Sequence, residues 1–326
     1  MAETAENRIN HYLEDVIGAE RNFEKALKSF SEAGTQASVQ RLMAKASAKA
    51  KTQHERLEAL LRRRGGTPSE AKTLLAEMLA FTPLSAQIGQ GAEEKNTQHL
   101  MVTFAAAAAE MAMYESLARA ASLTGDEDVV SLARTLQAEE RDDYDQVWGV
   151  LGQSAGDSFR AQLARGKLAQ EVIGVYLQDA IAAEKSFETQ LTGFSKEADD
   201  PVLQNLFQQH AEETRQQYTL LTNRLEELGG STSGFKSFLA HFFNFAPKIA
   251  QLGHEKSERV TQNLMMAYAV ENSEVAMYES MATAAELASD SRTAQIARQI
   301  QEQERETAEK VWAQIAPAAQ RSMAAA

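Results

Sequence analysis

The stretch YLEDVIGAERNF, residues 12–23, returns later in the chain as YLQDAIAAEKSF, residues 176–187. Tyr, Leu, Asp, Ile, Ala, Glu and Phe occupy equivalent places in the two copies. A shift of 164 residues (176 minus 12) aligns the chain with itself without a gap from Tyr12 to the C-terminus. A repeat of this length is a whole domain and not a solenoid unit. We therefore expect two tandem domains that meet near residue 162, at residues 1–162 and 163–326.

Each repeat has the pattern of long helices, because stretches rich in Ala, Leu, Glu, Gln and Lys are separated by Gly and Pro. In the first repeat we expect helices at about residues 6–32, 37–64, 91–123 and 127–151, with one or two short helices around residues 70–79 and 83–88. In the second repeat, Asp200-Pro201 is a typical helix start. No run of alternating β-branched residues predicts a strand. The predicted fold is all-α, with two tandem ferritin-like four-helix bundles, because the connection after the second helix is long.

The composition narrows the class of protein. The chain has 326 residues, a net charge of −13 and no cysteine, so disulfides and thiolate metal sites are excluded. The excess of acidic residues argues against binding to nucleic acid or anionic lipid. The N-terminal residues lack the features of a signal peptide, and no apolar stretch is long enough to span a membrane. We expect a cytoplasmic protein.

Acidic residues of the second repeat lie on the faces of helices that should point into the bundle. On a wheel of 100° per residue, Glu184 falls in the middle of the apolar arc of its helix. The same construction places further acidic residues and one histidine on inner faces: His210, Glu213, Glu271, Glu274 and Glu304. A lone buried carboxylate costs several kcal/mol, so these groups need partners or protons. Hard oxygen ligands with a histidine suit a dinuclear Fe or Mn site.

The first repeat differs at the equivalent positions. Lys49 stands in place of Glu213, while Ala46 and Ala107 stand in place of His210 and Glu271. An ammonium group can neutralise an acidic cluster through charge-assisted hydrogen bonds. We therefore interpret the first repeat as a structural charge cluster in place of a metal site. Its predicted members are Glu20, Lys49, Glu110, Glu139, Glu140 and Asp143.

These motifs resemble those of the YciE/YciF family of bacterial ferritin-like proteins, which are stress-associated and have a poorly defined role. The first-helix pattern is matched by Leu13-Asp15-Ala19-Glu20-Phe23 and by its copy in the second repeat, and HAEET at residues 210–214 matches the second-helix pattern. The resemblance implies a ferritin-like core with a dinuclear metal site. Two features depart from the family pattern: two copies are fused here, and neither copy keeps the full ligand set.

Two functions stay open on the sequence alone. The first is a stress-associated ferritin-like protein whose first repeat is structural and non-catalytic. The alternative is a di-iron or di-manganese carboxylate protein, with weak oxidase or ferroxidase-type activity or metal storage in the second repeat. The two repeats are expected to pack as a pseudo-dimer, since two-fold pairing is the commonest arrangement. Formation of a homo-oligomer also stays open.

Overall fold

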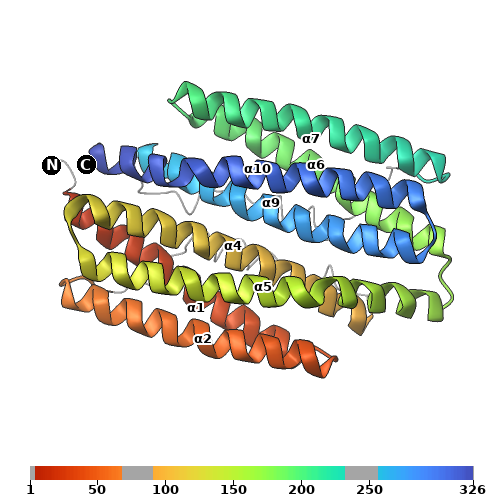
Figure 1. Cartoon of the computed structure of the whole chain (residues 1–326), viewed down its shortest axis with the longest axis horizontal. Helices are drawn as coiled ribbons and strands as arrows, with labels where there is room; N and C mark the ends of the chain where they lie inside the picture. Colours follow the sequence, from red (N-terminus) through yellow and green to blue (C-terminus); the bar gives the residue numbers. More distant parts are fainter. Residues whose placement is uncertain (1–3, 68–90, 232–255, 326) are drawn as a thin grey trace.

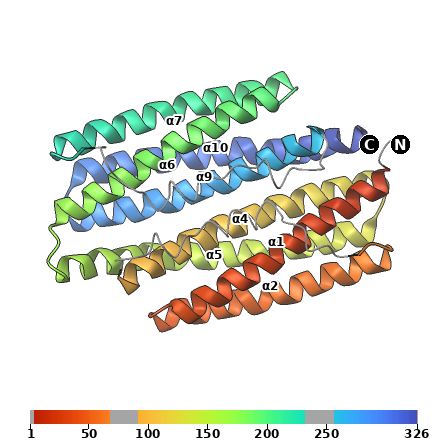
Figure 2. The ribbon, with the colours of Figure 1, turned by 180° about the vertical axis from the view of Figure 1, so that it is seen from behind.

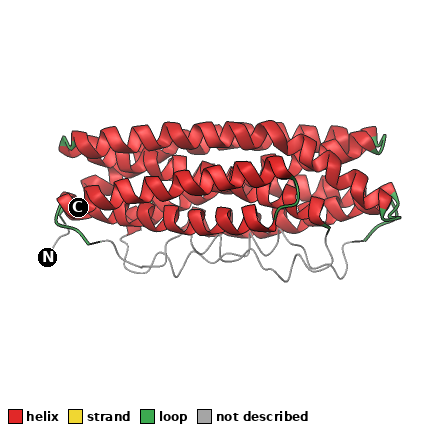
Figure 3. Ribbon diagram, turned by 90° about the horizontal axis from the view of Figure 1, so that it is seen from below, coloured by secondary structure: helices red, strands yellow, loops and turns green. Residues whose placement is uncertain are grey.

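The computed structural model describes residues 4–67, 91–231 and 256–325, and these residues form helices connected by short turns (Figure 3). The first half contains α1 (Ala5–Ala33), α2 (Ala37–Arg63), α4 (Ala92–Thr124) and α5 (Glu127–Ala164). The second half contains α6 (Ala169–Glu197), α7 (Pro201–Glu227), α9 (Lys256–Leu287) and α10 (Ser291–Ala324). The described residues contain no strand, so the predicted all-helical fold with two domain-like halves is confirmed. The short helices expected around residues 70–79 and 83–88 lie outside the described residues.

Polar caps fix where several helices begin. The side chain of Asp200 accepts a hydrogen bond from the backbone N–H of Val202 at 2.8 Å, and Pro201 occupies the first turn of α7, as the sequence predicts. Asp126 and Asp290 cap α5 and α10 in the same way. Each cap satisfies a backbone N–H group that has no carbonyl partner within its helix.

Helix α5 is longer than the sequence predicts. It continues past the expected end at residue 151 to Ala164, because Gly152 does not break the helix. A Cβ atom at Gly152 would lie 3.3 Å from the carboxylate of Glu279, on α9. The glycine therefore allows a close approach of α5 to α9, and tertiary packing outweighs its low helix propensity. The turn between the halves follows at residues 165–168.

The helices of each half pack in pairs, α1 with α2 and α4 with α5, and likewise α6 with α7 and α9 with α10. The two halves meet mainly through α4, α5, α9 and α10, so α2 and α7 lie at opposite edges of the molecule (Figures 1 and 2). No described helix has a stretch both long and apolar enough to cross a lipid bilayer.

Contacts across the interface between the halves are reciprocal. The hydroxyl of Ser116 lies 3.5 Å from the sulfur of Met265, and the hydroxyl of Ser280 lies 3.6 Å from the sulfur of Met101. Because Ser280 and Met265 are the repeat equivalents of Ser116 and Met101, the same contact occurs twice with the halves exchanged. A two-fold arrangement of like surfaces produces this reciprocity.

The central helices α4 and α9 are buried on almost every side. Residues 99–114 of α4 and residues 261–278 of α9 are buried throughout, including the alanine run at residues 105–109. A helix that is enclosed all round has no polar face. Any acidic residue on it must therefore find its partner inside the protein.

Candidate metal centre

The second half brings five potential metal ligands together from all four of its long helices. α6 carries Glu184, α7 carries His210, α9 carries Glu271 and Glu274, and α10 carries Glu304. All five side chains are at most 2% exposed. The contribution of α7 is therefore an imidazole, while each of the other three helices supplies at least one carboxylate.

The five ligands form two groups that share one residue. The first group contains His210, Glu271 and Glu304, and the second contains Glu184, Glu274 and Glu304. Within each group the ligand atoms lie within 4.8 Å of one another. Because Glu304 belongs to both groups, the two groups are adjacent and share one carboxylate.

Most of these polar atoms have no hydrogen-bond donor in the described structure. Among the described residues, no amide or hydroxyl donates to either carboxylate oxygen of Glu271 or Glu274, and Glu184 and Glu304 each have one such oxygen; Glu271 is within hydrogen-bond reach of Glu304 only through a shared proton. The Nδ1 atom of His210 lies 3.1 Å from Glu271 without forming an aligned hydrogen bond. A buried polar group without a partner costs about 1–3 kcal/mol, and a charged one costs more. The arrangement therefore needs either protons or a cation in the centre.

Burial and neighbouring carboxylates raise the pKa values of these glutamates. Burial, followed by the neighbouring Glu304, raises the pKa of Glu271 and of Glu184 well above 4.5. Burial also raises the pKa of Glu274, with Glu184 and then Glu304 as the next causes. Without a cation the folded protein therefore holds protons on this site at a pH where free glutamate is ionised.

Neighbouring side chains hold several ligands in place. The hydroxyl of Tyr278 donates to Glu184, and the amide of Gln217 donates to Glu304. The ring of Phe187 packs edge-on against His210 with centroids 5.2 Å apart. Tyr278 and Gln217 are supporting residues that the sequence analysis does not single out. Their signal was the helical spacing, since Tyr278 follows Glu274 by one turn and Gln217 follows His210 by two.

Glu213 is the one predicted ligand of the second half that the structure does not bring into either group. It is half-buried on α7, three residues after His210. The other predicted ligands, Glu184, His210, Glu271, Glu274 and Glu304, all lie in the two groups.

The predicted cluster of the first half is also assembled. The Nζ atom of Lys49 lies 2.6 Å from Asp143 and 3.6 Å from Glu140, and Lys49 donates to the backbone carbonyl of Glu139. The side chain of Glu139 is one-third exposed and accepts from Arg56 at 3.0 Å. Glu139 is therefore at the margin of the cluster.

Three glutamates form the interior of this cluster. The ligand atoms of Glu20, Glu110 and Glu140 lie within 4.8 Å of one another. Tyr114 donates to Glu20, and Gln53 donates to Glu140 at 2.7 Å. Burial raises the pKa of Glu20 well above 4.5, and the charge of Glu140 is the next cause. Burial also raises the pKa of Glu110 well above 4.5, and there the charge of Glu20 is the next cause.

A family model described as a domain of unknown function, DUF892, matches the chain twice, at residues 4–155 and 169–324. The chain belongs to this family. No curated protein and no solved structure gives a significant match. The first match contains α1, α2 and α4 and ends within α5, and the second contains all four helices of the second half, so each covers one of the two carboxylate clusters.

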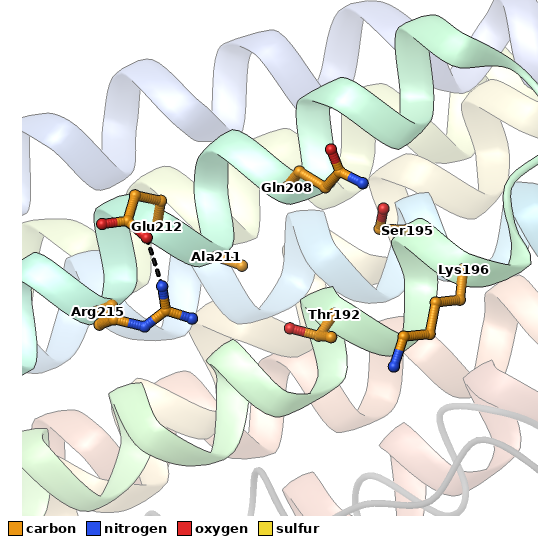
Figure 4. Close-up of a pocket in the computed structure, with 7 residues that line it drawn as sticks. All are labelled: Thr192, Ser195, Lys196, Gln208, Ala211, Glu212 and Arg215. Atoms are coloured by element: carbon orange, nitrogen blue, oxygen red, sulfur yellow. Dashed lines mark hydrogen bonds and ion pairs between the residues drawn. The ribbon is translucent and has the colours of Figure 1, made fainter.

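The outer face of the second DUF892 unit carries a separate small groove between α6 and α7 (Figure 4). Its volume is about 200 Å³. The guanidinium of Arg215, one of the lining residues, lies 2.5 Å from Glu188 and also pairs with Glu212. The residues that line the groove include none of the five buried ligands. We therefore place the candidate site of this DUF892 unit in the interior.

Proposed function

We propose that the second half is a ferritin-like unit that holds a pair of Fe or Mn ions between Glu184, His210, Glu271, Glu274 and Glu304. The observation that carries the proposal is the pair of buried donor groups that share Glu304. On this basis we propose a di-iron or di-manganese carboxylate protein of the YciE/YciF type. Its activity would be of the oxidase or ferroxidase type, or it would store the metal, in a stress-associated role.

The chemistry of the donor set supports these metals. Four carboxylates and one imidazole form a mostly hard set, which suits Fe and Mn. Ferritin-like carboxylate proteins build their sites from inward-facing Glu and His side chains of four helices. Here the site contains a single histidine, and no described helix of the second half supplies a second one to the two groups.

The surrounding residues would prepare the site before any ion arrives. Tyr278 and Gln217 each occupy one oxygen of Glu184 and Glu304, which leaves the other oxygen of each for the centre. Phe187 covers one edge of the His210 ring and excludes water there. A bound pair of Fe(II) ions would supply electrons to O₂ at this position.

Metal analysis of one variant tests the proposal. The protein is freed of metal with a chelator, loaded with Fe(II) or Mn(II) without oxygen, desalted and analysed. We expect Glu304→Gln to lower the metal content by about two ions per chain, because this residue belongs to both groups. Glu213→Gln is the matched control and should leave the content unchanged.

An equal metal content in the wild-type protein and in Glu304→Gln would contradict the proposal. The buried carboxylates of the second half would then be protonated and structural. The first of the two functions that the sequence leaves open, a structural and non-catalytic protein, would then apply to this half as well.

A further inference from the structure

We propose that the first half binds one hard divalent cation between Glu20, Glu110 and Glu140, beside an ion pair of Lys49 and Asp143 that the second half lacks. This inference changes the interpretation of the first half from a purely structural cluster to a one-ion site. It extends the proposed function to the half that the sequence marks as degenerate.

The first step is the charge of Lys49. Its ammonium lies 2.6 Å from Asp143 but 3.6 Å from Glu140, so Asp143 is its nearest carboxylate. In the second half, the equivalents of Lys49 and Asp143 are Glu213 and Thr307. The first half therefore has a lysine and an aspartate at two positions where the second half has neither residue. Lys49 also acts on Glu140, but one ammonium faces four carboxylates, so Lys49 and Asp143 together leave the negative charge of the three glutamates largely uncompensated.

The second step concerns the glutamates that remain. Glu20, Glu110 and Glu140 are at most 1% exposed. In the part of the chain that the structure describes, no amide or hydroxyl donates to either oxygen of Glu110, which is within hydrogen-bond reach of Glu140 only through a shared proton, and Glu20 and Glu140 each have one oxygen without such a donor. Three buried carboxylates with four free oxygens require either shared protons or a cation.

The third step is the match with the second half. Glu20, Glu110 and Glu140 are the repeat equivalents of Glu184, Glu274 and Glu304, which form one complete donor group there. The supporting donors are also equivalent, since Tyr114 and Gln53 correspond to Tyr278 and Gln217. The oxygens without an amide or hydroxyl donor among the described residues are also equivalent in the two halves. They are Oε2 of Glu20 and of Glu184, both oxygens of Glu110 and of Glu274, and Oε2 of Glu140 and of Glu304.

The donor set indicates the class of cation. Ala46 and Ala107 replace His210 and Glu271, so the other donor group is lost and no imidazole remains. An all-carboxylate set suits hard ions such as Mg²⁺ and Mn²⁺ and disfavours softer metals. We therefore expect a single ion of this class in the first half.

Mn(II) binding in a background without the second centre tests this inference. The background carries Glu271→Gln and Glu304→Gln, and its fold is checked by circular dichroism. We expect about one Mn(II) per chain, with the electron paramagnetic resonance signal of an isolated ion. Adding Glu110→Gln should abolish this binding. Glu24→Gln, one helical turn after Glu20 on α1, is the matched control and should keep it.

A third variant separates the cation from the lysine. Removing the ion pair with Lys49→Met and Asp143→Thr should leave the binding of one Mn(II) unchanged. If Mn(II) binds only after Lys49 is removed, the lysine already neutralises the glutamates and the inference is wrong. It is also wrong if the folded background binds no more Mn(II) than Glu110→Gln does. Neither result depends on the second half, because its centre is absent from the background.

Discussion

The guanidinium of Arg8 on α1 lies 3.6 Å from the carboxylate of Glu258 on α9, and the two side chains are 0% and 4% exposed. Arg8 also donates to the backbone carbonyl of Ser322 on α10. One buried side chain of the first half thus joins two helices of the second. At the equivalent position of the second half stands Val172, so this link is made once and not twice.

Arg8→Ala should lower the free energy of unfolding by about 3–5 kcal/mol, because it removes a fully buried guanidinium that pairs with Glu258 and donates to the carbonyl of Ser322. Urea unfolding followed by circular dichroism measures the change. Arg8→Val combined with Glu258→Leu should recover most of the loss, since it removes both charges and fills the space. Equal losses in the single and the double variant would show that packing of the arginine, and not its charge, is what matters.

The shared position of Glu304 predicts different metal losses for different ligands. Glu274 and His210 each belong to one donor group, so Glu274→Gln and His210→Ala should each remove about one ion per chain. Glu304→Gln should remove about two. Elemental analysis of the desalted variants measures this. Loss of both ions in Glu274→Gln would mean that the two positions fill only together.

The chelated protein should become less stable as the pH rises from about 5 to 8. Burial and Glu304 place the folded-state pKa of Glu271 well above 4.5, so the folded state binds more protons than the unfolded state above pH 4.5. The free energy of unfolding therefore falls with increasing pH until the folded-state pKa is passed. Melting temperatures of the wild-type protein and of Glu271→Gln check this.

The variant should show a shallower fall than the wild-type protein, and this difference isolates Glu271 from other titrating groups. Loading with Mn(II) should also reduce the fall, because a cation then takes the place of the protons. Identical pH dependence in the two chelated proteins would contradict the buried, proton-holding state of this residue.

Two glycines three residues apart on α5 should respond differently to alanine. A Cβ at Gly149 would meet no atom within 4 Å, so Gly149→Ala should raise the free energy of unfolding by about 0.5–1 kcal/mol. A Cβ at Gly152 would lie 3.3 Å from Glu279, which accepts from Gln301 at 3.0 Å and is therefore held in place. Gly152→Ala should give no gain. Equal gains in urea unfolding would contradict the close approach of α5 to α9.

Sequence periodicity located the long helices well because Gly and Pro separate them, but it ended α5 too early. Gly152 looks like a helix breaker until the neighbouring α9 is known. The helical wheel likewise found every member of the two donor groups. It could not separate His210 from Glu213, since both fall within one apolar arc and only the position of the adjacent helices decides which one is enclosed. The donors Tyr278 and Gln217 needed the packed structure for the same reason.

The covalent union of the two halves has a genetic consequence. In a symmetric dimer of identical chains, one codon specifies each position in both subunits, so an alanine in place of the histidine would remove the imidazole from every site. Here the two copies are encoded separately. One copy carries Ala46 and the ion pair of Lys49 with Asp143 while the other carries His210, and both copies still form the reciprocal contacts of Ser116 with Met265 and of Ser280 with Met101.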